Sequence, residues 1–342
     1  MDPPRCRGTD WSMLITSRTP LRVSFFGGGT DYPEYYERRP GAVVGMAINK
    51  YIYVSALRLA NFLQYKYRVA YSRIETVGGI EDIQHPVVRT LLQHYRIEDS
   101  LDINIVADLP ASSGLGSSSA FTVGLINLIS SLRSEPLTKL DLGLKAIFVE
   151  RELLKERVGV QDQLHAAYGG LNRFDFVDGR IRISPVQMTS ECQRYFLSST
   201  VLLFTGITRW ASENLDEQID SMKGHKVDRE LGHLLDLTTE AVRVLEGRDP
   251  EAMLREFGAM MHEGWMVKRK LSTKVSNPQI DELYDRARAA GALGGKLCGA
   301  GGGGFLLMVV PPHLRDKFVA AVAPTAVIPV GLDTLGSTII YQ

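Results

Sequence analysis

Cysteine is scarce in this sequence, and the three cysteines it contains are far apart. Cys6, Cys192 and Cys298 form no close pair among 342 residues, so the sequence predicts neither a disulfide framework nor a structural zinc site. The seven histidines include no HExxH pattern, and no serine lies in a Gly-x-Ser-x-Gly elbow. Metalloprotease and serine hydrolase chemistry therefore have little support.

The sequence also lacks an excess of charge of one sign and any long apolar segment. Thirty-nine basic residues balance 39 acidic ones, so no global field attracts nucleic acid or anionic lipid. The longest apolar stretches, such as Ala42–Ile48 and Phe305–Val310, fall far short of the ~20 residues that span a bilayer. Met1–Ser12 has no apolar region of a secretory signal. We therefore expect a soluble cytoplasmic protein that binds neither nucleic acid nor a membrane.

Glycine, in contrast, is concentrated in three clusters that each lie between apolar segments. They are Phe26–Asp31, Ala111–Ser119 and Gly299–Gly304. Glycine placed in this way allows positive φ and a close approach of the backbone to a ligand. We interpret the three clusters as loops that shape a binding site.

The periodicity of apolar residues predicts an α+β fold in two domains. The expected strands are Leu21–Phe26, Val43–Leu57, Gln64–Tyr71, Leu101–Val106, Asn172–Phe176, Arg180–Ser184 and Gly336–Tyr341, with two more on either side of the third glycine cluster. The expected helices are Pro86–Tyr95, Phe121–Leu132, Thr138–Arg157, Ser212–Met222, Asp228–Leu245, Pro250–Leu271 and Asn277–Gly291. Strand-rich sequence becomes helix-rich near residue 190. We therefore predict domains at residues 13–190 and 191–342.

The second glycine cluster follows an expected strand and precedes an expected helix. This arrangement is typical of phosphate binding, because the first turn of a helix has unpaired N–H groups and a partial positive charge. Serine hydroxyls add donors, and one oxygen can ligate Mg²⁺ carried by a nucleotide. The loop lacks the Lys-[Ser/Thr] ending of a Walker A motif. A serine-capped helix after a flexible turn remains the alternative.

The third glycine cluster formally matches the dinucleotide-binding pattern G-x-G-x-x-G, yet Phe305–Val310 continues as a strand. A Rossmann loop opens a helix instead and has an acidic residue about 20 positions later. We therefore expect a strand–loop–strand hairpin. The hairpin either packs against the phosphate loop or the substrate, or is a plain Gly-rich turn.

Two acidic residues stand out in the middle of the chain. The helix expected at Thr138–Arg157 has an apolar stripe formed by Leu140, Leu144, Ile147 and Leu154. Glu150 falls on this stripe, where a carboxylate is costly unless it is paired or binds a cation. An ion pair with Arg151 and a Mg²⁺ ion are the two explanations. Asp162, taken alone, is typical of an acid at a helix start or facing solvent.

Three motifs in this order resemble the signatures of the GHMP kinase superfamily. They are Pro20–Asp31, Leu109–Ala120 and Lys296–Gly304, and the resemblance extends from about Ile15 to Tyr341. The runs 27–33, 159–163 and 294–296 are most similar to the D-glycero-D-manno-heptose 7-phosphate kinases. Those enzymes phosphorylate the anomeric C1 hydroxyl of a heptose that already carries a phosphate at C7.

The resemblance implies a ribosomal-protein-S5-like N-terminal domain and a ferredoxin-like C-terminal domain, with ATP and substrate in the cleft between them. It implies that the nucleotide is bound by Pro110, Ser112, Ser113, Gly114, Leu115, Gly116, Ser117, Ser118 and Ser119. Ser118 and Glu150 match the family's Mg²⁺ ligands. Asp162 matches the proposed catalytic base, and Arg22 matches a basic residue near the transferred phosphoryl group.

The resemblance also implies a substrate site, made of Gly28, Gly29, Thr30, Asp31, Gly301, Gly302 and Lys268. Asp31 matches a sugar-hydroxyl contact of galactokinases. Gly28 and Gly29 replace the Glu-His pair of galactokinases, so we do not expect galactose as the substrate. Ser119 stands where the superfamily usually has alanine, and we expect little consequence. Candidates for binding the phosphate of a phosphorylated sugar are Arg73, Lys268, Lys270 and Lys274.

Together these residues predict a Mg²⁺-dependent kinase that transfers the γ-phosphoryl group of ATP to the anomeric hydroxyl of a heptose 7-phosphate. One alternative is a kinase for another sugar, such as L-fucose. The other is a catalytically silent relative that binds nucleotide or sugar as a sensor. The sequence makes no prediction of the oligomeric state.

Overall fold

The computed structural model describes residues 14–60, 63–207 and 212–342. Cys6, the segment Met1–Ser12 and the expected domain start at residue 13 lie outside the described residues. None of the helices in the described ranges combines the length and the apolar character that a membrane span requires.

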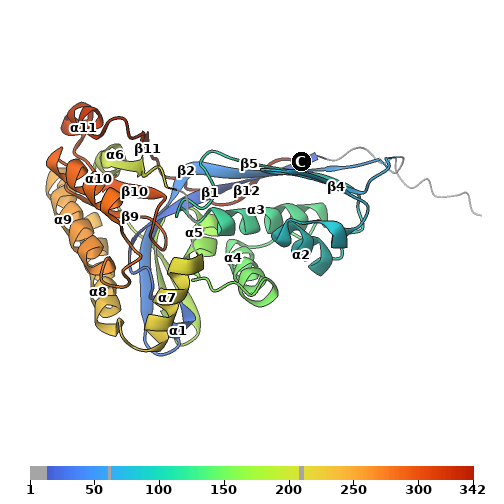
Figure 1. Ribbon diagram of the computed structural model, residues 1–342, viewed down its shortest axis with the longest axis horizontal. Coiled ribbons are helices and arrows are strands. Elements are labelled where there is room, and N and C mark those ends of the chain that lie inside the picture. Colours follow the sequence, from blue (N-terminus) through green and yellow to red (C-terminus); the bar gives the residue numbers. More distant parts are fainter. Residues whose placement is uncertain (1–13, 61–62, 208–211) are drawn as a thin grey trace, which may run out of the picture.

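A mostly antiparallel sheet forms the first part of the molecule (Figure 1). Its main path runs β12-β1-β2-β5-β3-β4, with β6 paired to β2 and β7 to β6. The strands are β1 (Leu14–Phe26), β2 (Gly41–Arg58), β3 (Tyr67–Ala70), β4 (Ile74–Val77), β5 (Leu101–Ala107), β6 (Leu171–Val177), β7 (Arg180–Pro185) and β12 (Thr338–Tyr341). The alternation of apolar and polar residues along β1, β2 and β5 buries one face of the sheet.

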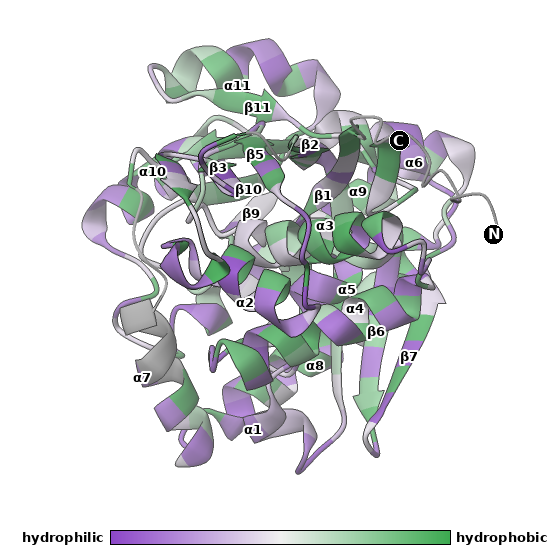
Figure 2. Ribbon diagram, turned by 90° about the vertical axis from the view of Figure 1, so that its right-hand side faces the viewer, coloured by the Kyte–Doolittle hydropathy of each residue, from purple (hydrophilic) through white to green (hydrophobic). Residues whose placement is uncertain are grey.

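Helices cover one face of this sheet (Figure 1). They are α2 (Pro86–His94), α3 (Ser117–Leu132), α4 (Lys139–Phe148) and α5 (Gln161–Tyr168), while a short helix, α1 (Pro33–Tyr36), follows the first glycine cluster. The central helix α3 is largely hydrophobic in Figure 2, and most of its residues are buried. It begins directly after the second glycine cluster, so burial of α3 holds this cluster at one end of the sheet.

The second part of the molecule contains a smaller sheet of order β11-β8-β10-β9. Its strands are β8 (Thr200–Phe204), β9 (Gly294–Leu297), β10 (Phe305–Val309) and β11 (Val327–Pro329). The helices are α6 (Ser190–Ser199), α7 (Ser212–Lys223), α8 (Asp228–Leu245), α9 (Pro250–Lys268), α10 (Pro278–Ala289) and α11 (Arg315–Val322). The chain order β8, helices, β9, β10, α11, β11 is the ferredoxin-like βαββαβ arrangement. The predicted α+β class and the ferredoxin-like second domain are confirmed.

The last strand returns to the first sheet. β12 pairs antiparallel with β1, with Thr16 opposite Tyr341 and Arg18 opposite Thr338. The end of the chain therefore completes the sheet that the beginning of the chain started. The domain boundary near residue 190 stays a prediction.

Most expected elements are present with bounds shifted by a few residues. The turn Asp178-Gly179 joins β6 to β7, with φ of 51° and 69°. Asn277 caps α10, since its side chain accepts a hydrogen bond from the N–H of Ile280 at 3.0 Å. The sequence pattern does not predict the short elements α1, β4, α5, α6, β8, α11 and β11. The strand β8 is not predicted because it is a nearly continuous buried run, in which apolar and polar residues do not alternate.

The apolar stripe predicted for Thr138–Arg157 is wrong. Leu140 and Leu144 are 38% and 42% exposed. The buried face instead runs through Leu142, Ala146 and Glu150, because α5 packs closely against that side at Gly143. The α-helix ends at Phe148 and continues as one π-helical turn, Val149–Leu153. A π-helical turn of this kind is frequent at functional sites.

Candidate active site

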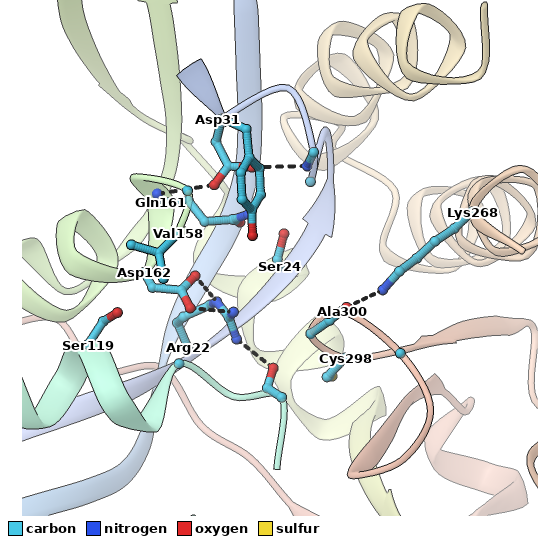
Figure 3. A pocket seen from close by; sticks show the side chains of 18 of the residues that line it. Arg22, Ser24, Asp31, Ser119, Val158, Gln161, Asp162, Lys268, Cys298 and Ala300 are labelled. Carbon is cyan, nitrogen blue, oxygen red and sulfur yellow. Dashed lines mark hydrogen bonds and ion pairs between the residues drawn. The ribbon is translucent and has the colours of Figure 1, made fainter. Parts of the chain in front are cut away.

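A cleft of about 620 Å³ brings the three glycine clusters together (Figure 3). Residues from β1, the start of α3, the loop before α5, the helices α8 and α9, and the β9–β10 hairpin line it. A cavity of this size fits a small-molecule ligand.

The centre of the cleft is an ion pair between Arg22 on β1 and Asp162 in the first turn of α5 (Figure 3). The Nε and Nη2 atoms of Arg22 each donate to one carboxylate oxygen of Asp162 at 2.8 Å. Nη1 of Arg22 donates to the carbonyl oxygen of Gly114 at 2.7 Å. This two-pronged geometry fixes the orientation of the carboxylate. The structure thus joins two predicted catalytic residues that are 140 positions apart and ties them to the second glycine cluster.

The second glycine cluster presents the N-terminus of α3 to the cleft. Gly116 is the N-cap residue, with φ of 73°, and no side chain caps the helix. The N–H groups of the first turn therefore remain available to an anion. Ser117, Ser118 and Ser119 all line the cleft. A Cβ at Gly116 would lie 3.2 Å from Oδ2 of Asp162, so glycine lets this turn approach the ion pair.

The third glycine cluster packs against the second, backbone to backbone. It is the turn of the antiparallel β9–β10 hairpin, as expected, and the dinucleotide interpretation has no support. A Cβ at Gly114 would lie 2.6 Å from the carbonyl oxygen of Cys298, and a Cβ at Gly304 would lie 2.3 Å from that of Ser113. Such contacts admit only glycine. Of the roles left open for this hairpin, the structure shows packing against the second glycine cluster.

Asp31 forms another part of the cleft, beside Asp162. Its Oδ1 accepts from the N–H of Gly29 at 3.0 Å and its Oδ2 from the N–H of Gln161 at 3.3 Å. Burial raises the pKa of Asp31 above its ordinary value. The side chain is 1% exposed, yet it belongs to the cleft lining. Asp31 can therefore offer its remaining lone pairs to a ligand hydroxyl.

Glu150 is buried behind the cleft rather than in its lining. Arg151 is not its partner, because the Nη1 of Arg151 donates to the hydroxyl of Tyr36 at 2.9 Å. Oε2 of Glu150 accepts from the amide of Gln163 and from the hydroxyl of Ser119, the latter at 2.9 Å. Within the part of the chain that the structure describes, Oε1 has no hydrogen-bond partner. Burial raises the pKa of Glu150 to about 7.

Ser119 makes a structural contact that the sequence does not predict. Its side chain lines the cleft and donates a hydrogen bond to the buried Glu150 carboxylate. The hydroxyl therefore lies between the cleft and the acid. Alanine could not donate this hydrogen bond, but the expectation that the departure from alanine has little consequence stays a prediction.

The structure places the other predicted residues in two groups. Those lining the cleft are Ser112, Gly114, Gly28, Gly29, Gly301 and Lys268. Those outside the lining are Pro110, Ser113, Leu115, Thr30 and Gly302. Most of the second group have structural contacts. For example, the Thr30 hydroxyl donates to carbonyl oxygens of the loop and of β2, and the N–H of Gly302 donates to the carbonyl of Val275.

Several lining residues were missed from the sequence. Ser24 lies two positions after Arg22, and strand alternation predicts a shared face. Lys296 is a lone charge in a short buried strand, which is itself a signal of function. The loop Lys155–Gly159 before α5 gave no pattern that pointed to the cleft.

Comparisons with known proteins agree with this geometry. The family model "GHMP kinases N terminal domain" matches residues 82–170, and "GHMP kinases C terminal" matches residues 251–327. The chain is 29% identical to a D-glycero-alpha-D-manno-heptose 7-phosphate kinase from Campylobacter jejuni, over 90% of this chain and 92% of that protein. It is 24% identical to part of a bifunctional fucokinase/GDP-fucose pyrophosphorylase from Arabidopsis thaliana, over 87% of this chain and 30% of that protein.

A solved structure is also similar. The crystal structure of a D-glycero-D-manno-heptose 1-phosphate kinase from Bacteroides thetaiotaomicron matches with a TM-score of 0.72 and 26% identity, over 96% of this chain and 100% of that chain. Fold and site together define a phosphotransferase whose acceptor is an alcohol group. The chain belongs to the GHMP kinases.

Proposed function

We propose that this chain is a cytoplasmic sugar kinase that transfers the γ-phosphoryl group of ATP to the anomeric hydroxyl of a heptose 7-phosphate. The observation that carries the proposal is the Arg22–Asp162 ion pair, which lies between the start of α3 and the buried Asp31 in one cleft. The name of the Campylobacter relative supplies the heptose 7-phosphate.

The start of α3 is the part of the cleft best suited to the nucleotide phosphates. It offers uncapped N–H groups, and Ser117 and Ser118 add hydroxyl donors. Phosphoryl transfer depends mostly on positioning and on neutralisation of charge. Arg22 reaches both this loop and Asp162, so its guanidinium stabilises negative charge that develops between donor and acceptor.

Asp162 is the group that takes the proton from the attacking hydroxyl. Arg22 occupies one lone pair on each of its oxygens and leaves another on each for a substrate hydroxyl. An anomeric hydroxyl is more acidic than an ordinary alcohol, so its proton can be accepted late in the reaction. Asp31 accepts a hydrogen bond from another sugar hydroxyl and fixes the ring in the cleft.

The residues at the start of α3 fit a Mg²⁺ ion that arrives with the nucleotide. The described residues hold no group of three or more His, Cys, Asp or Glu side chains that would bind a metal unaided. Ser118 and Glu150 are hard oxygen donors of the kind Mg²⁺ prefers, and Oε1 of Glu150 is a buried oxygen without a partner. When bound, Mg²⁺ would neutralise phosphate charge.

The first glycine loop favours a bulky sugar. A Cβ at Gly28 would meet Ser24 and Gln161 only at 3.6 Å, an ordinary contact, so the missing side chain leaves room in the cleft. A seven-carbon sugar with a terminal phosphate needs such room. The fucokinase relative supports L-fucose as the second candidate.

A substrate panel tests the proposal. The purified chain is incubated with MgATP and, separately, with D-glycero-D-manno-heptose 7-phosphate, the same heptose without phosphate, L-fucose and galactose. We expect Mg²⁺-dependent ADP release with the heptose 7-phosphate and a phosphorus NMR signal from a new phosphate at C1. Turnover of L-fucose alone would identify the second candidate. Absence of ADP release with every sugar would support the silent sensor.

A further inference from the structure

Two ammonium groups line the cleft, that of Lys268 partly buried and that of Lys296 buried, and neither has a carboxylate partner among the residues that the structure describes. Lys268 is the last residue of α9, and Lys296 lies in β9 with its residue only 9% exposed. Figure 3 shows Lys268 reaching in from α9, on the side opposite Asp31 and Asp162. The other cations that line the cleft all have acidic partners: Arg22 pairs with Asp162, Lys155 with Glu152 and Arg157 with Asp220.

Both lysines contact only uncharged acceptors. Nζ of Lys268 donates to the carbonyl oxygens of Leu297 at 2.9 Å and Gly299 at 2.5 Å. Nζ of Lys296 donates to the carbonyl oxygen of Phe25 at 2.9 Å. Among the described residues, no ion pair includes either lysine. Each ammonium has three donors, so Lys268 retains one for a ligand and Lys296 retains two.

Few acidic groups offset the positive charges of Lys268 and Lys296. Burial lowers the pKa of Lys296 to about 8. Burial also lowers the pKa of Lys268, and repulsion by Lys296 lowers it further. Cys298 and, more weakly, Asp31 oppose this effect on the pKa of Lys296, but both oxygens of Asp31 already accept backbone hydrogen bonds. Like charges that are buried together are costly unless an anion joins them.

The hydrogen bond of Lys296 to β1 places the pair beside the acceptor, whereas Lys268 is joined to the third glycine cluster, which also packs against the nucleotide loop. Lys296 bonds to Phe25, the residue directly before the first glycine cluster, which we assign to the sugar. Lys268 holds the third cluster. The nucleotide phosphates have their own donors at the start of α3. A second anion in the same cleft therefore belongs to the sugar.

We propose that Lys268 and Lys296 together bind the phosphate group of the acceptor sugar and so select a phosphorylated substrate. This inference rests on the proposed function, because a heptose 7-phosphate carries such a group. It extends the assignment of Lys268 from sequence to a pair of cations. The other sequence candidates, Arg73, Lys270 and Lys274, are exposed and do not line the cleft.

The test uses Lys268→Gln and Lys296→Gln, which remove the charge and keep an N–H donor. Lys274→Gln is the matched control, because Lys274 lies outside the cleft and pairs with Glu217 at 3.5 Å. The kcat/KM is measured for heptose 7-phosphate, for the heptose without phosphate, and for ATP. We expect each cleft variant to lose roughly 10–100-fold on the phosphorylated sugar, the range for a hydrogen bond to a charged group. The values for the unphosphorylated sugar and for ATP stay within a few-fold, and the control matches the parent.

Other outcomes overturn the inference in recognisable ways. Equal losses on both sugars would mean that the lysines only hold the third glycine cluster and β1. A raised KM for ATP with sugar preference intact would assign them to the nucleotide. If the parent protein shows no preference for the phosphorylated heptose, the proposed substrate itself fails.

A measurement on the parent protein covers the case in which a variant does not fold. We expect inorganic phosphate to inhibit competitively with heptose 7-phosphate and noncompetitively with ATP. Competition with ATP alone, or no inhibition up to concentrations far above KM, would contradict the inference.

Discussion

Asp162 depends on Arg22 for its direction, since both of its oxygens are held by one guanidinium. Replacement of Asp162 is therefore the most direct test of the proposed chemistry. In Asp162→Asn the amide keeps one acceptor but cannot take a proton, and its NH₂ group faces the cation. We expect kcat to fall by ~10²–10⁴-fold, the usual contribution of a positioned base. The Kd for ATP should change little, and isothermal titration measures it.

The matched control is Asp99→Asn, which removes the acid of the half-exposed Arg58–Asp99 ion pair. Asp99 does not line the cleft, so we expect the activity of Asp99→Asn to equal that of the parent protein. If Asp162→Asn kept turnover within a few-fold, Asp162 would lose the role of base.

The lowered pKa of His165, on α5, predicts how the free energy of unfolding depends on pH. Burial lowers the pKa of His165 to about 4, below the 6.5 of an unfolded chain. Between these values the unfolded state binds the proton and the folded state does not, so stability is complete above about pH 6.5 and falls as the pH falls toward 4. Protonation of this one group therefore lowers the free energy of unfolding by roughly 3 kcal/mol. Urea denaturation at pH 7.5 and at pH 4.5 measures it.

The replacement His165→Asn should flatten this pH dependence. The Nδ1 atom of His165 pairs with the carbonyl of Gln161 at 2.8 Å, and an asparagine amide can donate in its place. His233→Asn serves as the control, because His233 lies at the surface beside Glu263. A pH dependence that is the same in His165→Asn as in the parent would exclude His165 as its source.

At this scale the sequence predicts residue types better than partners. Arg22 and Asp162 are recognised from motifs, but nothing local shows that they meet. Glu150 is correctly predicted to be buried, yet its partners are Ser119 and Gln163 rather than Arg151. Partners depend on which helices pack together, and Gly143 sets that contact through the absence of a side chain.

At the scale of elements, the interlocked glycine loops make a paired prediction. Gly114 and Gly179 both have positive φ, 79° and 69°, so alanine strains the backbone by roughly 1–2 kcal/mol at either position. A Cβ at Gly179 meets nothing within 4 Å, whereas at Gly114 it meets the carbonyl of Cys298 at 2.6 Å. We expect Gly114→Ala to lose roughly 10²-fold in kcat/KM for ATP through loop displacement. Gly179→Ala should lower the stability of the protein without changing kcat/KM.

Thermal melting and steady-state kinetics on both variants separate the two effects. Equal kinetic losses in Gly114→Ala and Gly179→Ala would show that strain, rather than contact between the loops, is responsible.

Elements with a clear period are predictable from sequence, and short or fully buried ones are not. β2 and β5 alternate, and α8 and α9 keep a helical period, so each is found within a few residues, whereas β1 begins at Leu14, well before the predicted Leu21. The π-helical turn at Val149–Leu153 has no signature in the sequence, because it results from packing around the buried Glu150.

At the scale of the whole molecule, β12 links the chain ends. Deletion of residues 338–342 removes the partner of β1, the strand that carries Arg22. We expect a lower Tm, by about 2–4 °C for each kcal/mol of stability lost in a domain of this size, together with reduced activity. Deletion of Gln342 alone, which removes only the side-chain bond from Ser131, should have little effect. Differential scanning calorimetry of the two truncated proteins makes the comparison, and equal Tm values would show that β12 is dispensable.

The sequence predicts β12 as a strand but not the sheet to which it belongs. Composition divides the chain near residue 190 and assigns everything after it to the second domain. The pairing of Thr338 with Arg18 joins positions more than 300 residues apart, and no local pattern encodes such a contact.

This late pairing bears on how the protein is made. The other strands of the large sheet all come from the first 185 residues, while β12 comes from the last five. At ~5–20 residues per second, a ribosome needs roughly 10–30 s to synthesise the remainder. During that interval the nascent sheet exposes the backbone of β1 as an open edge. An unpaired strand edge can pair with another chain, so residues 16–18 of β1 stay open to such pairing until β12 has been synthesised.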